Sequence, residues 1–163
     1  TVIGAASSDE KLEVVKKAGA DHLINYSSGD LREQLKEIVG SKEAVDVLYD
    51  PVGADLFEPA LRSMKWKGRA LVIGFAGGDD KIPKIPMNLP LLKGCSIVGV
   101  FWGSFRVRES EVEFENFNQL FEWFNTGKID PLVSDVYPLE EAAIALRKLM
   151  NRQAIGKIVL TTE

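Results

Sequence analysis

Residues 1–26, TVIGAASSDEKLEVVKKAGADHLINY, decide the fold of this chain because two short apolar segments flank an amphipathic one. Val2–Ala5 is typical of a buried strand, and the segment that follows has apolar residues at helical spacing. Ser7 begins a capping-box pattern, S-x-x-E, which predicts the start of the helix. Residues 22–26, HLINY, are typical of a second short strand. A strand, a helix and a strand in this order predict a β-α-β unit with parallel strands.

The same alternation continues along the rest of the chain. We expect helices at 30–39, 54–64, 112–125 and from Pro138 to 153, and strands at 45–50, 69–75, 95–103 and 156–162. Between residues 81 and 94, three closely spaced prolines predict an extended loop that ends in a single helical turn at Leu89–Lys93. Near-continuous apolar strands separated by amphipathic helices predict an α/β protein with a doubly wound, mostly parallel Rossmann-like sheet.

The composition excludes several classes of function. The chain has 163 residues and a net charge of −4, which suits one globular domain and argues against a nucleic-acid-binding surface. No apolar stretch approaches the roughly 18 residues that span a bilayer. One cysteine, Cys95, and one histidine, His22, leave no disulfide framework, zinc cluster or Ser-His-Asp set. We therefore expect a cytoplasmic protein with no metal site, no catalytic acid or base within this chain, and no nucleic-acid or membrane partner.

In a doubly wound sheet, ligands bind beyond the carboxyl ends of the strands. Asp50 and Val52 follow the strand at 45–50 and would line an adenine, although Pro-Val-Gly is equally typical of a simple turn. Gly74 and Phe75 follow the next strand and would meet a nicotinamide, although glycines there also suit a tight turn. Trp102 lies near the end of the strand predicted at 95–103. It is more typical of a core or interface aromatic than of a cofactor contact.

The end of the first strand predicts which cofactor binds. NAD-specific folds usually carry an acidic residue there for the ribose 2′-hydroxyl, and this chain has Ala6 instead. Ser7, Lys11 and, at the next strand end, Tyr26 offer hydroxyls and a positive charge that suit a 2′-phosphate. The pattern favours NADP(H) and argues against a methyltransferase, which usually needs the acidic residue. The alternative is that Ser7 only caps the helix and Lys11 is a solvated surface charge.

Five segments together resemble the quinone oxidoreductase branch of the zinc-independent medium-chain dehydrogenase/reductase superfamily. They are GAASSDEKLEVVKKAGADHLINY, VDVLYDPVG, WKGRALVIGFAGG, LLKGCSIVGVFWGSF and GKIVL, in order along the chain. The resemblance implies an NADPH-dependent reductase that passes hydride to a quinone, an enone or a similar activated alkene. It also implies a homodimer formed through the Cys95–Val100 strand, whose apolar edge is a suitable partner surface.

The resemblance further implies roles for residues at matching positions. Ser7, Lys11 and Tyr26 would lie at the 2′-phosphate, Gly74 and Phe75 at the cofactor loop, Trp102 and Gly103 beside the nicotinamide, and Arg152 at the phosphates. Members of the branch carry a catalytic domain, a first strand and a glycine-rich turn before the segment that this chain matches. We therefore expect residues 1–152 to be a partial NADP-binding domain, residues 153–163 to be a strand that returns to the catalytic domain, and the isolated chain to be inactive. A non-catalytic association module and an enoyl reductase of the same superfamily remain as alternatives.

Overall fold

The computed structural model describes residues 1–40, 45–78 and 81–162. The chain divides into two compact units, the first ending at Trp102 and the second beginning at Gly103. The first unit contains β1 (Ile3–Ala6), α1 (Asp9–Lys17), β2 (His22–Asn25), α2 (Leu31–Val39), β3 (Val45–Asp50), η1 (Ala54–Leu56), α3 (Phe57–Arg62), β4 (Met64–Val72), α4 (Asn88–Lys93) and β5 (Ser96–Gly99). The second contains α5 (Trp102–Arg108, which begins at the boundary), α6 (Ser110–Asn125), β6 (Val133–Pro138), η3 (Leu139–Glu141), α7 (Ala142–Met150) and β7 (Lys157–Thr161).

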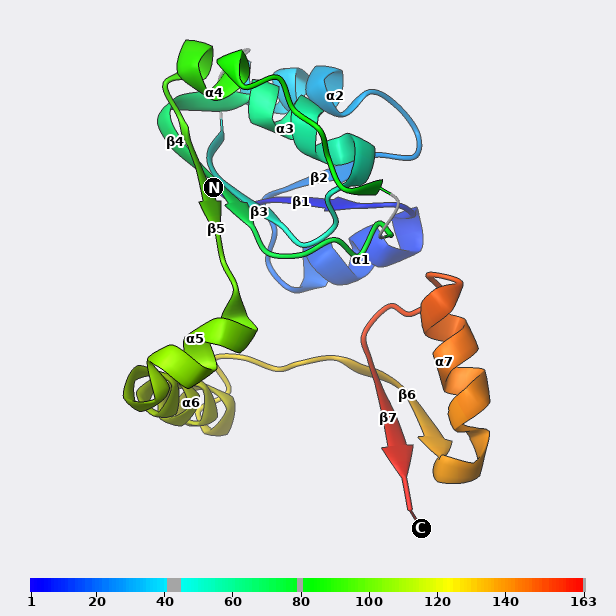
Figure 1. Cartoon of the computed structure of the whole chain (residues 1–163). Coiled ribbons are helices and arrows are strands. Elements are labelled where there is room, and N and C mark those ends of the chain that lie inside the picture. Colours follow the sequence, from blue (N-terminus) through cyan, green and yellow to red (C-terminus); the bar gives the residue numbers. More distant parts are fainter. Residues whose placement is uncertain (41–44, 79–80, 163) are drawn as a thin grey trace. The chain divides into compact units, whose positions relative to one another are not determined.

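All strands of the first unit pair in parallel. β1 pairs with β2, and the other three strands form a sheet in the order β3-β4-β5. In Figure 1, α1 lies on one side of the strands and α2 and α3 lie on the other. Helices on both sides of parallel strands confirm the predicted doubly wound α/β fold.

The helix ends follow their capping residues, with one correction to the sequence prediction. Ser8, not Ser7, is the N-cap of α1, and its side chain accepts a hydrogen bond from the Lys11 amide at 3.4 Å. The prediction placed the capping box one residue too early, so Ser7 is free of that role. Asp30 caps α2 by accepting from two backbone amides of the first turn, and Gly40 ends the helix in the left-handed conformation.

The core of the first unit lies between α3, α4 and β4. Its buried cluster consists of Phe57, Leu61, Met64, Ala70 and Leu89. Both Leu61 and Met64 are fully buried, so the end of α3 and the start of β4 are held by packing. This core fixes the strands whose carboxyl ends carry the candidate site.

The second unit contains a strand that the sequence did not predict. β6 pairs in parallel with β7, and Pro138 is the last residue of β6 instead of the first residue of a helix. The helix begins at Ala142, after a short 3-10 turn. Ala145 is the buried residue of this helix, whereas Leu146 and Leu149 are more than half exposed.

Candidate cofactor-binding site

The loop after β3 is shaped by the carboxylate of Asp50. This side chain is buried, and one of its oxygens accepts hydrogen bonds from the amides of Val52 at 2.8 Å and Gly53 at 2.9 Å. The Asp50 carbonyl oxygen accepts from the Ile73 amide at 3.0 Å. Because both amides are bound within the loop, the carboxylate acts first on the loop conformation. Asp50 therefore lies in the candidate site as a residue that positions its neighbours.

Two backbone hydrogen bonds join this loop to the loop after β4. The amide of Ala76 donates to the carbonyl of Pro51 at 3.0 Å, and the amide of Gly77 donates to the carbonyl of Val52 at 2.9 Å. A Cβ atom at Gly77 would lie 2.8 Å from the Val52 oxygen, closer than real Cβ atoms approach. Glycine is therefore required at position 77 for the two loops to meet.

Gly53 is required for a related reason. Its φ is +67°, and a Cβ atom there would lie 2.9 Å from the ring of Phe75. Gly53 and Gly77 both lie in loops that the sequence indicated as the ligand-binding edge, but the sequence assigned neither glycine a contact of its own. Their role depends on contacts between two loops that are distant in the sequence.

The structure brings together the four predicted residues of these loops, which are Asp50, Val52, Gly74 and Phe75. The Phe75 ring packs against Gly53 and is 41% exposed, so one part of it is open to a ligand. At Gly74 a Cβ atom would meet only the Pro51 oxygen, at 3.4 Å. An exposed ring beside accessible backbone can contact a flat group such as a nicotinamide or an adenine.

A second group of candidate residues lies at the paired ends of β1 and β2. The Tyr26 amide donates to the carbonyl of Ala6 at 3.1 Å, so the residues that follow the two strands begin side by side. Ser7, Lys11 and Tyr26 are all half-buried. Their two hydroxyls and one ammonium group are the kinds of donor that an anionic phosphate accepts hydrogen bonds from.

The connection from β1 into α1, called the elbow below, also contains the carboxylate of Asp9, which was not among the predicted site residues. The side-chain amide of Asn25 donates to Asp9 at 2.7 Å, which links the first turn of α1 to the end of β2. Asn25 also accepts from the amide of Ser27 at 3.0 Å. The 16-residue separation of Asp9 and Asn25 gave no local pattern from which this contact could be predicted.

The remaining predicted residues lie at or beyond the boundary between the units. Trp102 begins α5 and is 46% exposed, and Gly103 and Arg152 belong to the second unit. Arg152 has a φ of +58°, which is unusual for a residue other than glycine. Their predicted contacts with the cofactor stay predictions.

Neither a metal cluster nor a membrane-spanning helix is found in the described part of the chain. Within residues 1–40, 45–78 and 81–162, no three histidine, cysteine or acidic side chains gather closely enough to hold a metal ion. In the same ranges, every helix is too short or too polar to cross a membrane.

Comparison with known proteins establishes the family. The family model described as zinc-binding dehydrogenase matches residues 1–125. The chain belongs to this family. Its curated relatives place it in the quinone oxidoreductase branch: quinone oxidoreductase-like protein 2 of Bos taurus is 39% identical over 160 residues, covering 98% of this chain and 45% of the relative. Membership in the quinone oxidoreductase branch, which the five sequence segments predicted, is thereby confirmed.

Two further members of the branch are similar over the same range. The 2-haloacrylate reductase of a Burkholderia species is 34% identical over 160 residues, covering 98% of this chain and 47% of that protein. The crystal structure of Escherichia coli quinone oxidoreductase complexed with NADPH matches with a TM-score of 0.85 and 30% identity, covering 97% of this chain and 48% of that chain. The present chain thus spans about half the length of the curated relatives that it matches.

Proposed function

We propose that this chain forms the NADPH-binding part of an oxidoreductase that reduces a quinone, an enone or a similar activated alkene. The observation that carries the proposal is the donor set at the paired ends of β1 and β2. Ser7, Lys11 and Tyr26 are half-buried there, beside Ala6 and not beside a strand-end carboxylate. The similarity to a quinone oxidoreductase complexed with NADPH supports the same cofactor here.

In this proposal, each group of residues binds a different part of the cofactor. Ser7, Lys11 and Tyr26 hold the 2′-phosphate. Val52, in the loop after β3 that is hydrogen-bonded to the loop after β4, lies against the adenine. Gly74, Phe75, Trp102 and Gly103 lie along the nicotinamide, and Arg152 binds the phosphates. When bound, NADPH supplies the hydride, and the residues of this chain bind and orient it.

The proposal also includes the organisation predicted from the sequence. Residues 1–152 act as a partial cofactor-binding domain, and the strand within 153–163 joins a catalytic domain that supplies the groups facing the acceptor oxygen. The isolated chain is then inactive and binds NADPH only weakly. The proposal retains zinc-independent chemistry and a cytoplasmic location, which rest on the sequence alone.

Lys11→Glu tests the cofactor assignment in the protein that carries this chain. Removing one charged partner of a phosphate and adding a repulsive one should weaken NADPH binding at least about tenfold, with a smaller effect on NADH. Lys16→Glu, at the exposed end of α1, makes the same change of charge away from the elbow. Dissociation constants from fluorescence titration provide the measurement. Equal weakening of NADPH and NADH would contradict the proposed contact with the 2′-phosphate.

We also propose a homodimer formed through the Cys95–Val100 strand. β5 is the last strand in the order β3-β4-β5, and all four of its residues are exposed. Such an edge can pair with its copy across a two-fold axis. Val98→Lys places a charge on this edge, and sedimentation equilibrium should show the shift from dimer to monomer. The association-module alternative would be favoured by two results together. The protein would not bind NADPH, and the dimer would form equally well whether or not NADPH is added.

A further inference from the structure

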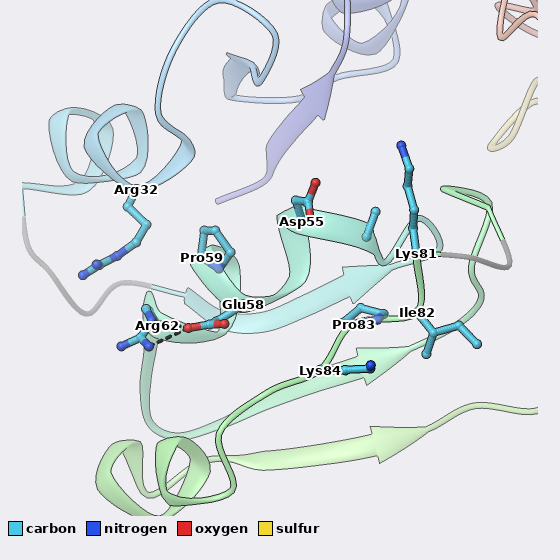
Figure 2. A pocket seen from close by; sticks show the side chains of 10 residues that line it. Arg32, Asp55, Glu58, Pro59, Arg62, Lys81, Ile82, Pro83 and Lys84 are labelled. Carbon is cyan, nitrogen blue, oxygen red and sulfur yellow. Dashed lines mark hydrogen bonds and ion pairs between the residues drawn. The ribbon is translucent and has the colours of Figure 1, made fainter.

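A hollow lies in the first unit, and none of the predicted cofactor residues lines it. It has a volume of about 860 Å³ and is lined by ten residues from the start of α2, from η1 and α3, and from residues 81–84 (Figure 2). This volume lies within the range of small-molecule sites, which is roughly 300–1,000 Å³.

The lining of this hollow is unusually rich in positive charge. Four of its ten residues are cationic, namely Arg32, Arg62, Lys81 and Lys84, and two are acidic, namely Asp55 and Glu58. The whole chain, by contrast, has 20 basic and 24 acidic residues. A cationic hollow in an acidic protein concentrates anions locally.

Among the residues that the structure describes, one of the four cations, Arg62, is paired with a carboxylate. Arg62 donates to Glu58 from Nε at 2.9 Å and from Nη2 at 2.5 Å. Within the part of the chain that the structure describes, the side chains of Arg32, Lys81 and Lys84 form no ion pair. Three positive groups around one hollow are therefore available to an anionic ligand.

The positive charges lie at two ends of the hollow, with the carboxylate of Asp55 between them. In Figure 2, Arg32 and Arg62 lie at one end of the hollow, and Lys81 and Lys84 lie at the other. Asp55 lies between the two pairs, whereas Glu58 lies beside Arg62, from which it accepts its hydrogen bonds. This arrangement favours an extended ligand with an anionic group at each end and would repel a negative charge at its centre.

The walls of the hollow are held by contacts within the first unit. Asp30 caps the turn of α2 that carries Arg32, accepting from the Arg32 amide at 2.9 Å. α2 packs against α3. On the opposite wall, Pro83 approaches Gly53, where a Cβ atom would lie 3.3 Å from the proline ring, and Ile85 packs against the buried core. The two ends are therefore fixed to separate elements before any ligand binds.

We propose that this hollow is a binding site for an organic bisphosphate with hydroxyl groups between its two phosphates. Arginine and lysine side chains at each end would bind the phosphates through charge-assisted hydrogen bonds. The carboxylate of Asp55 would accept hydrogen bonds from the central hydroxyls. Pro59 and Pro83 would contact the carbon skeleton. A phosphorylated sugar has this distribution of charge and donors.

Titration calorimetry with fructose 1,6-bisphosphate tests the proposal on the protein that carries this chain. Arg32→Gln and Lys84→Gln, one at each end, should each weaken binding about tenfold, the usual effect of losing one charge-assisted hydrogen bond. Lys16→Gln removes the same charge from an exposed site on α1 and should leave the affinity unchanged. Fructose 1-phosphate should bind at least about tenfold more weakly than the bisphosphate, because it reaches only one end.

Several results would overturn the proposal. The first is that fructose 1,6-bisphosphate does not bind at millimolar concentration. The second is that Lys16→Gln weakens its binding as much as Arg32→Gln and Lys84→Gln do. The third is that fructose 1-phosphate binds as tightly as the bisphosphate. Displacement of the probe by saturating NADPH would also overturn it, because the probe would then occupy the cofactor site. Lys11→Glu should weaken NADPH and leave the bisphosphate unaffected, so failure of either site can be recognised independently of the other.

Discussion

The amide of Gly77 donates to the carbonyl oxygen of Val52 at 2.9 Å, and this bond joins the loops that follow β3 and β4. The carboxylate of Asp50 holds the same Val52 segment from its other end. Because both contacts are to backbone groups, the surface offered by these loops depends on main-chain geometry more than on side-chain chemistry. A cofactor that lies on this surface would bind to a preformed site.

Gly77→Ala should disrupt the joined loops. The added Cβ would meet the Val52 oxygen at 2.8 Å, so one loop must shift, at a cost of about 1–3 kcal/mol in the free energy of unfolding. NADPH affinity should fall with it. Gly29→Ala is the matched control, since an added Cβ atom there would meet only the flexible side chain of Gln34, at 3.3 Å. Urea denaturation and fluorescence titration measure the two effects, and equal stability of both variants would contradict the close contact.

Asp50 provides a test that separates loop shaping from direct cofactor binding. Asp50→Ala leaves the amides of Val52 and Gly53 without their acceptor and should cost about 1–3 kcal/mol of unfolding free energy. Asp50→Asn keeps an acceptor oxygen in the same place and should retain most of that stability. If Asp50→Asn were stable but lost NADPH affinity as severely as Asp50→Ala, the carboxylate charge would contact the cofactor directly.

The alternation of strands and helices in the first unit could be predicted because each element carries its own local pattern. The apolar strand VDVLYD and the helix between Asp30 and Gly40 are examples in which the pattern and the capping residues agree. β6 lacked such agreement. Its sequence, VSDVYP, is short and polar, and Pro138 is equally compatible with a strand end and a helix start.

The composition of the candidate site was predictable, but its internal contacts were not. Strand order places Val52 and Phe75 at one edge, which a general rule about parallel sheets already indicates. The contact of Gly77 with Val52 and that of Asn25 with Asp9 join residues from different loops or elements. Such contacts depend on the packing of the whole unit, and no periodicity in one sequence encodes them.

Asp135 should stabilise the β6–α7 region in a pH-dependent way. Hydrogen bonds from Lys148 and from Ser134 lower the pKa of its carboxyl below the ordinary value. A lowered pKa in the folded state means that the stabilisation is fully present above the unfolded-state pKa, about 4, and is lost as the pH falls through the folded-state pKa. An NMR titration should show the midpoint of Asp135 below its usual range.

Lys148→Gln is the matching change, because it removes the first of these causes. The pKa of Asp135 should then move back toward its ordinary value, and the pH dependence of stability that this carboxyl contributes should become smaller. Lys157→Gln, on the neighbouring strand β7, removes an exposed charge and serves as the control. An unchanged Asp135 midpoint in Lys148→Gln would show that the ion pair does not form in solution.

At position 152, protein stability and cofactor binding should favour different residues. It follows the end of α7 with a φ of +58°, where its amide donates to the carbonyl of Leu149 at 2.9 Å and that of Gln153 to Lys148 at 3.0 Å. Glycine is the usual residue in this conformation, and Arg152→Gly should raise the unfolding free energy by about 1 kcal/mol. If the guanidinium binds the cofactor phosphates, the same variant should weaken NADPH binding. Arg152→Lys keeps the charge and the strained backbone. It should therefore retain more NADPH affinity than Arg152→Gly, without the gain in stability. Unchanged NADPH affinity in Arg152→Gly would remove Arg152 from the site.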